Sequence, residues 1–199
     1  TGLIGKELGK VLAARGDTLV CLVRNAEAAR HRLPFPATCH EWDHRRAVPA
    51  TALVGVDAIV NLAGEPVAER RWSNEQKGLI RDTRVHGTRQ LVQAVLNHGA
   101  HAATFVQGSA IGFYGDRADE PLTALSAKGT GFLADVVADW EAELRPLTQR
   151  RPDARVAIVR TGIVLARHGG ALAKMLPMFR ESAAGRLGSG RQWMSWIHI

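Results

Sequence analysis

The chain has 199 residues, of which 46% are hydrophobic and 23% are charged, and its formal net charge at pH 7 is +7. This length suits about one domain with a sizeable core. No apolar run approaches the ~20 residues that a membrane helix needs, and no secretion signal opens the chain. We therefore expect a cytoplasmic protein with no membrane partner.

The charged residues and cysteines exclude two further classes of protein. Arg supplies 21 of the 26 basic residues, but these are scattered along the chain. A nucleic-acid surface needs a basic patch or stripe, so we expect no nucleic-acid partner and assign a few Arg side chains to an anionic small molecule. Cys21 and Cys39 lack the spacing of metal ligands, so we expect structural thiols and no metal site.

Apolar runs typical of buried parallel strands alternate with segments of helical spacing. In chain order, a helix over 3–15 ends at a glycine, a strand follows at 18–23, and 30–36 is expected to be a loop. Ser73 is expected to be the N-cap of a long helix, with Gln76 at the capping-box position. Further strands are expected at 38–42, 56–62, 102–107, 155–160 and 196–199, and further helices at 73–98, 131–149 and 171–180.

This alternation predicts an α/β fold of the doubly wound Rossmann type, with a parallel sheet flanked by helices. Ligands of such sheets bind at the carboxyl ends of the strands. We assign residues 1–165 to a NAD(P)-binding domain whose first strand is absent. Residues 166–199 would begin a small C-terminal substrate domain that is largely missing. We therefore expect the chain to be a piece of a longer protein.

Two features at the start of the chain suit a dinucleotide. Gly2 and Gly5 could be the last two glycines of a phosphate-binding loop, where backbone N–H groups and a helix dipole meet a pyrophosphate. The alternative is a turn glycine and a small residue for close packing. Arg24 follows the strand at 18–23, where NAD-selective proteins carry an acid, so it favours the 2′-phosphate of NADP(H) over NAD(H). The alternative for Arg24 is a surface position. Asp43 follows the next strand and could accept from the adenine amine.

Several motifs in order resemble one family. They are Asn61-Leu62-Ala63-Gly64-Glu65-Pro66, Arg71-Trp72, Arg81-Asp82-Thr83-Arg84, Gly87-Thr88-Arg89, Ser109-Ala110-Ile111-Gly112-Phe113-Tyr114-Gly115, Arg160-Thr161-Gly162-Ile163-Val164-Leu165 and Gly188-Ser189-Gly190-Arg191-Gln192-Trp193. The pattern resembles the epimerase-family oxidoreductases of the atypical short-chain dehydrogenase/reductase class. The resemblance covers nearly the whole chain, and it implies a Rossmann domain followed by a small substrate domain.

The resemblance also implies positions for the cofactor. Residues near the pyrophosphate would be Gly2, Leu3 and Ile4, and Arg24 would lie near the adenosine phosphate. The ribose and nicotinamide would be lined by Leu62, Ala63, Gly64 and Glu65. Thr161 and Gly162 would approach the nicotinamide side of the cofactor.

The usual proton relay of this superfamily is a Tyr-x-x-x-Lys pair with a Ser, in which the Lys cation lowers the pKa of the Tyr. Here Tyr114 is the single tyrosine and Ala118 stands four residues later. Counting back from Glu141 places Leu133 and Val137 at the usual Tyr and Lys positions. The standard relay is therefore missing.

Three residues are candidates to replace it. Glu65 follows a strand and could be a general base, although a solvated loop acid or a ribose contact is the alternative. Ser109 follows the next strand and could orient the substrate or merely cap the strand end. Tyr114 suits hydrogen bonding better than proton transfer, since it lacks the Lys. An anionic substrate group could be bound by Arg84, by Arg191 or near Trp193.

Two hypotheses remain open at this point. The chain could be an NADP(H)-dependent, epimerase-like oxidoreductase that moves a hydride at a carbonyl or alcohol carbon of a small molecule. It could instead be a non-catalytic NADP(H)-binding sensor that has lost the relay. The resemblance implies a homodimer that forms through long helices, so the helices at 73–98 and 131–149 are the expected interface.

Overall fold

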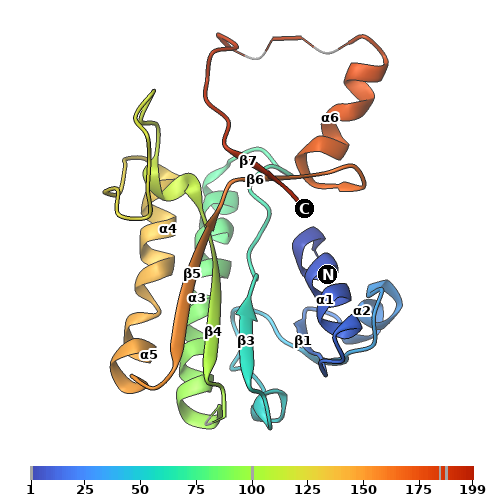
Figure 1. The fold of residues 1–199 in the computed structure, drawn as a ribbon, viewed down its shortest axis with the longest axis vertical. Coiled ribbons are helices and arrows are strands. Elements are labelled where there is room, and N and C mark those ends of the chain that lie inside the picture. The colour runs from blue at the N-terminus through green and yellow to red at the C-terminus, as the bar shows by residue number, and fades with distance from the viewer. Residues whose placement is uncertain (1, 100, 184, 187) are drawn as a thin grey trace.

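The computed structural model describes residues 2–99, 101–183, 185–186 and 188–199. Helices and strands alternate along the chain, as expected (Figure 1). The strands are β1 (Val20–Val23), β2 (Thr38–Glu41), β3 (Ala58–Asn61), β4 (Thr104–Ala110), β5 (Arg155–Thr161), β6 (Ile163–Ala166) and β7 (Trp196–His198). The helices are α1 (Leu3–Ala14), α2 (Ala26–Arg32), α3 (Asn74–His98), α4 (Phe132–Ala142), α5 (Arg145–Arg150) and α6 (Gly170–Arg180), with 3-10 turns η1 (Ala50–Leu53) and η2 (Ile111–Tyr114).

The strands pair in three parallel sheets, β1–β2, β3–β4–β5 and β6–β7. Helices flank them, with α3 and α4 beside the central sheet and α1 and α2 beside β1 (Figure 1). The predicted Rossmann-type α/β fold is confirmed. Because each strand of a parallel pair runs the same way, the carboxyl ends of β3, β4 and β5 meet at one edge of their sheet. Figure 1 shows α6, β6 and β7 beyond that edge.

The main core lies between the central sheet and the helices α3 and α5. Side chains of β4 alternate, so that Phe105, Gln107 and Ser109 are all buried on one face. From α3, Val92 and Val95 are almost fully buried in the same cluster. Each such side chain stabilises the fold by about 1.5–3 kcal/mol relative to an exposed position. The core therefore fixes α3 and α5 against the central sheet.

Two expected elements differ from the structure. The loop expected at 30–36 is wrong at its start, because α2 continues to Arg32. Its N-cap Asn25 accepts a hydrogen bond from Ala28, and basic residues fill its last turn, which complements the helix dipole. The single helix expected over 131–149 is two helices. Pro146 lies in the first turn of α5, where its missing N–H costs nothing, so a new helix starts there.

The long helix α3 begins as predicted. The Ser73 hydroxyl accepts a hydrogen bond from the backbone N–H of Gln76 at 3.2 Å, which satisfies one of the free donors of the first turn. The reciprocal half of the capping box is not formed among the described residues. The Gln76 side-chain nitrogen is buried without a hydrogen-bond partner there.

Candidate functional site

A pocket of about 220 Å³ opens where β1, β2 and β3 end. Arg24 comes from the end of β1, Asp43 from the turn after β2 and Glu65 from the loop after β3. Helix α3 closes another side. The lining residues are Arg24, Asp43, His44, Arg45, Glu65, Leu79 and Thr83. The structure thus brings together Arg24 and Asp43, which the sequence analysis assigned to the adenosine end of a cofactor, and adds Glu65 to them.

The loop after β3 is held against α3 by its backbone. The N–H of Glu65 donates to the Thr83 hydroxyl at 3.0 Å, and the Glu65 carbonyl accepts from the Arg84 guanidinium at 2.9 Å. Gly64 lies close against the same guanidinium, since a Cβ there would stand 3.0 Å from the Arg84 Cζ. Arg84 also lies 5.2 Å from the ring centre of Trp140, and burial lowers its pKa. Arg84 therefore holds the loop after β3 in place against α3.

The start of the same loop rests on a buried polar chain. The Asn61 side chain donates to the Thr88 hydroxyl at 2.9 Å and to the Gln107 side chain at 3.0 Å, and it accepts from the N–H of Ala63. Trp140 donates to the same Thr88 hydroxyl at 2.7 Å. Because these buried groups pair with one another, the network stabilises one loop conformation.

Ser109 and Tyr114 lie in a second cluster, joined by Glu141 and Arg160. The Ser109 hydroxyl donates to the Glu141 carboxylate at 2.6 Å, and Arg160 donates to both Glu141 oxygens at 2.8 and 2.7 Å. Arg160 also donates to the Tyr114 hydroxyl at 3.0 Å and stacks 3.5 Å from the Phe113 ring centre. The hydrogen bonds to Glu141 raise the pKa of Arg160, so the cation is permanent.

The three candidates for proton transfer therefore fall in two places. Glu65 lines the pocket with Arg24 and Asp43, whereas Ser109 and Tyr114 belong to the cluster around Glu141 and Arg160. The Ser109 proton is committed to Glu141. The Tyr114 oxygen accepts from Arg160, and its own O–H donates to no other group among the described residues. Sequence reasoning used Glu141 only to count along the helix, and it overlooked Arg160, although a cation inside an apolar strand needs an acidic partner.

The N-terminus of α1 is open toward solvent. Gly2 is its N-cap and no side chain caps the helix, so the first N–H groups keep their hydrogen-bonding capacity. A Cβ at Gly2 would meet nothing within 4 Å, which leaves room for a ligand beside the backbone. Leu3 instead points at the turn before α6, where a Cβ at Gly169 would come within 3.0 Å of it, and Ile4 is exposed.

Comparison with known proteins adds the family. The sequence model of the NAD dependent epimerase/dehydratase family matches residues 1–199. The chain belongs to this family.

Its relatives in the family are longer. The epimerase family protein Mb2239 of Mycobacterium bovis is 42% identical over the whole chain, which spans 63% of that relative. A crystal structure of human epimerase family protein SDR39U1 with NADPH is similar over 99% of this chain and 63% of its own, with a TM-score of 0.80 and 29% identity. A nucleoside-diphosphate sugar epimerase from Corynebacterium glutamicum is 29% identical, with a TM-score of 0.71 over 96% of this chain and 44% of its own.

Leu133 and Val137 lie against the 3-10 turn η2. A Cβ on Gly112 would stand 3.5 Å from the Leu133 Cβ and 3.9 Å from Val137, so both side chains approach the η2 backbone. Sequence counting placed these two residues at the Tyr and Lys positions. Leu133 and Val137 therefore pack against a turn, and neither side chain has a group that transfers a proton.

Of the expected nicotinamide-side and substrate-side residues, Thr161 ends β5, and Gly162, Arg191 and Trp193 follow it along the chain. The Thr161 hydroxyl donates to the Ser109 carbonyl at 3.2 Å, and Gly162 lets the backbone of Ser195 approach, since a Cβ would be 2.8 Å from its oxygen. Trp193, 76% exposed, donates to the Asp119 carboxylate at 2.6 Å. Arg191 is exposed on the same segment.

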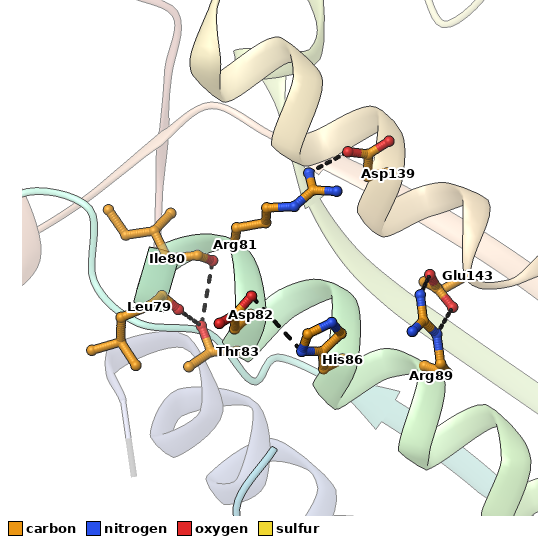
Figure 2. A network of polar contacts seen from close by, with 9 residues as sticks. All are labelled: Leu79, Ile80, Arg81, Asp82, Thr83, His86, Arg89, Asp139 and Glu143. Carbon is orange, nitrogen blue, oxygen red and sulfur yellow. Dashed lines mark hydrogen bonds and ion pairs between the residues drawn. The ribbon is translucent and has the colours of Figure 1, made fainter. Parts of the chain in front are cut away.

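The outer faces of α3 and α4, proposed from sequence as a dimer interface, are joined by charged pairs. Figure 2 shows Arg81 of α3 reaching Asp139 of α4, and Arg89 meeting Glu143 two turns along. The second pair is bidentate, at 2.9 and 2.6 Å. These contacts lie within one chain. A partner packed on this face would have to cover or replace them, at a desolvation cost.

Within the part of the chain that the structure describes, no group of three or more His, Cys, Asp or Glu side chains is placed to hold a metal ion. Nor is any helix there both long enough and apolar enough to span a membrane.

Proposed function

We propose that this protein binds NADP(H) and is an epimerase-like oxidoreductase acting on a small-molecule substrate. The observation that carries the proposal is the pocket at the ends of β1, β2 and β3, with Arg24 at its rim. In open α/β sheets, ligands bind in the crevice beyond the carboxyl ends of the strands. The NADPH in the human SDR39U1 structure supports the same cofactor in this relative.

The residues fit the two halves of such a cofactor. The adenosine would lie in the pocket, where Leu79 offers an apolar surface and the Glu65 carboxylate can accept from ribose hydroxyls. The pyrophosphate would meet the open N-terminus of α1 beside Gly2, since helix dipoles and free N–H groups favour anions. A Cβ at Gly5 would stand 3.9 Å from Leu62, so α1 packs close to the loop after β3 and the two halves of the site adjoin.

The nicotinamide, when bound, supplies a hydride acceptor or donor for a carbonyl or alcohol carbon. The chain's own contribution is to orient the substrate oxygen. Tyr114 keeps one O–H donor, and its oxygen accepts from Arg160, which Glu141 in turn fixes. This arrangement would replace the missing Tyr-x-x-x-Lys pair. Sugar nucleotides are the first substrates to screen, because a family neighbour is named a nucleoside-diphosphate sugar epimerase.

The second candidate function is an NADP(H)-binding sensor. One observation favours it: the Ser109 proton and both Glu141 oxygens already form hydrogen bonds within the protein. A catalytic acid or base needs a free position toward its substrate. The two candidates share the cofactor site and differ only in turnover.

We also propose the domain boundaries. Residues 1–165 would form the cofactor-binding unit, and 166–199 would begin the substrate-side unit. The place of α6 and β7 beyond the strand ends supports this division (Figure 1).

Titration calorimetry of the full-length protein with NADPH and then NADH tests the proposal. We expect tight NADPH binding, weaker NADH binding, and loss of this preference in Arg24→Ala. Absorbance of NADPH is then followed over a panel of aldehydes, ketones and sugar nucleotides. Turnover supports the enzyme, whereas tight binding with a silent panel supports the sensor. Absence of binding to either nucleotide would refute both.

A further inference from the structure

The turn that follows β2 is held rigidly on the rim of the pocket. The Asp43 carboxylate accepts from the backbone N–H of Arg45 at 2.8 Å, and the Asp43 carbonyl accepts from the N–H of Arg46 at 3.1 Å. The indole of Trp42 donates to the Arg46 carbonyl at 2.9 Å. Since Trp42 is only 7% exposed and belongs to the main core, the turn is tied to the interior of the protein.

Helix α3 supports the same turn from its other side. A Cβ at Gly87 would stand 3.4 Å from the Cβ of His44 and 3.5 Å from the Trp42 ring. The helix backbone therefore packs closely beneath the turn. Together these contacts give the backbone of Arg45 one position, facing the pocket that it lines.

Two arginines that line this pocket differ from most of the ion-paired arginines of the chain. Six arginines elsewhere in the described chain have a carboxylate partner, and Arg46, directly beside the pocket, pairs with Asp43 at 3.5 Å. Arg24 and Arg45 line the pocket, and neither has a hydrogen bond or ion pair from its side chain among the described residues. Glu65 lines the pocket as well, yet it forms no ion pair with either of them there.

We propose that Arg45 is a second guanidinium that binds the 2′-phosphate of NADP(H), opposite Arg24, and that Asp43 positions it by capping its turn. The inference rests on the proposed cofactor. A phosphate monoester carries about −1.5 to −2 charges at neutral pH, which matches two cations. Two planar guanidiniums from separate strand ends can each bind it through paired hydrogen bonds. Asp43 then acts on the phosphate through Arg45 and is a positioning residue.

The test compares Arg45→Ala with the neighbouring Arg46→Ala in the full-length protein. Titration calorimetry measures the Kd for NADPH, NADH and adenosine 2′,5′-bisphosphate. Losing a charge-assisted contact should raise the Kd of the two 2′-phosphorylated ligands by about 10- to 100-fold. The Kd of NADH should stay unchanged, and Arg46→Ala should resemble the wild type. Because Arg45→Ala keeps the backbone N–H, the turn itself remains capped.

Asp43 is tested by two substitutions. Asp43→Ala removes the cap and should weaken NADPH binding, whereas Asp43→Asn keeps an oxygen acceptor for the Arg45 N–H and should retain most of the affinity. In the combined Arg24→Ala and Arg45→Ala variant, the loss should be smaller than the product of the single losses, because both side chains bind one group.

The outcomes separate this inference from the proposed function. If Arg45→Ala weakens NADPH and NADH equally, or behaves like Arg46→Ala while the wild type binds NADPH tightly, the inference is wrong and the proposed cofactor stands. If the wild type binds neither nucleotide, the proposed function itself fails, and the inference fails with it.

Discussion

Replacing Glu141 by Ala should destabilise the folded protein far more than the loss of an exposed acid on the same helix would. Glu141 is 10% exposed and Arg160 19%, and the carboxylate accepts from Ser109 and twice from Arg160. Removing one partner of a buried pair costs about 3–5 kcal/mol. Arg160 keeps its bonds to Tyr114 and to the Ala124 carbonyl, so we expect the lower end, about 3 kcal/mol.

The assay is thermal and urea unfolding of the full-length protein, with Asp139→Ala as the matched control. Asp139 lies on the same helix and pairs with Arg81, but both side chains are 45% exposed. Exposed pairs contribute about 0–1 kcal/mol. For a chain of this size, a loss of about 3 kcal/mol lowers Tm by roughly 6–12 °C.

A loss in Glu141→Ala no greater than in Asp139→Ala would refute the reasoning, since it would mean that the cluster is solvated. A double-mutant cycle with Arg160→Ala adds a second check. Because the two side chains contact each other directly, their effects should not add, and a coupling of at least about 0.5 kcal/mol is expected.

Two further substitutions and one thiol-alkylation experiment test other parts of the fold. Gly162→Ala would place a Cβ 2.8 Å from the Ser195 carbonyl, so the β6–β7 pairing should loosen at a cost of about 1–3 kcal/mol, measured as faster amide exchange at Ile163. The control is Gly78→Ala, which has open space around it and should be neutral or stabilising. Equal effects of the two substitutions would contradict the close packing at Gly162. Ser73→Ala should lower the free energy of unfolding by about 1 kcal/mol through loss of the N-cap, whereas Ser73→Thr should retain most of the stability of the wild type. An equal loss in both variants would show that the hydroxyl does not cap α3. Burial raises the pKa of the Cys21 thiol, so the protonated form persists in the folded state to higher pH than in the unfolded chain. Alkylation of Cys21 by iodoacetamide near about pH 8 should therefore be slow and should accelerate in urea. A rate equal to that of free cysteine would argue against this burial.

Much of the nucleotide end can be predicted from the sequence alone. Strand ends in a parallel sheet meet at one edge, so Arg24 and Asp43 are expected near each other, and both line one pocket. The direction of the loop after β3 is not predictable in this way. The Glu65 N–H donates to Thr83 and the Glu65 carbonyl accepts from Arg84, on a helix about 20 residues away in sequence, and these bonds decide that Glu65 faces the same pocket.

The cluster around Glu141 shows a second limit. Ser109 is expected at the ligand edge because it follows the apolar run of β4. Alternation along the strand instead places it on the buried face with Phe105 and Gln107, against α4. That alternation can be read from the sequence, but the partners that use it cannot. Glu141 lies 32 residues later and Arg160 a further 19 residues on.

The sequence by itself determined the α/β fold, the order of its elements apart from α2, β6 and the division of α4 from α5, the cap of α3 and the family, because these follow from local periodicity and from short motifs. Only the tertiary structure decided which charges face a ligand and which neutralise each other. Arg45 and Arg46 are neighbours with identical side chains, yet one lines the pocket and the other pairs with Asp43. Their difference arises from the turn, the Trp42 anchor and the close approach of α3 at Gly87, which bring together groups that lie far apart along the chain.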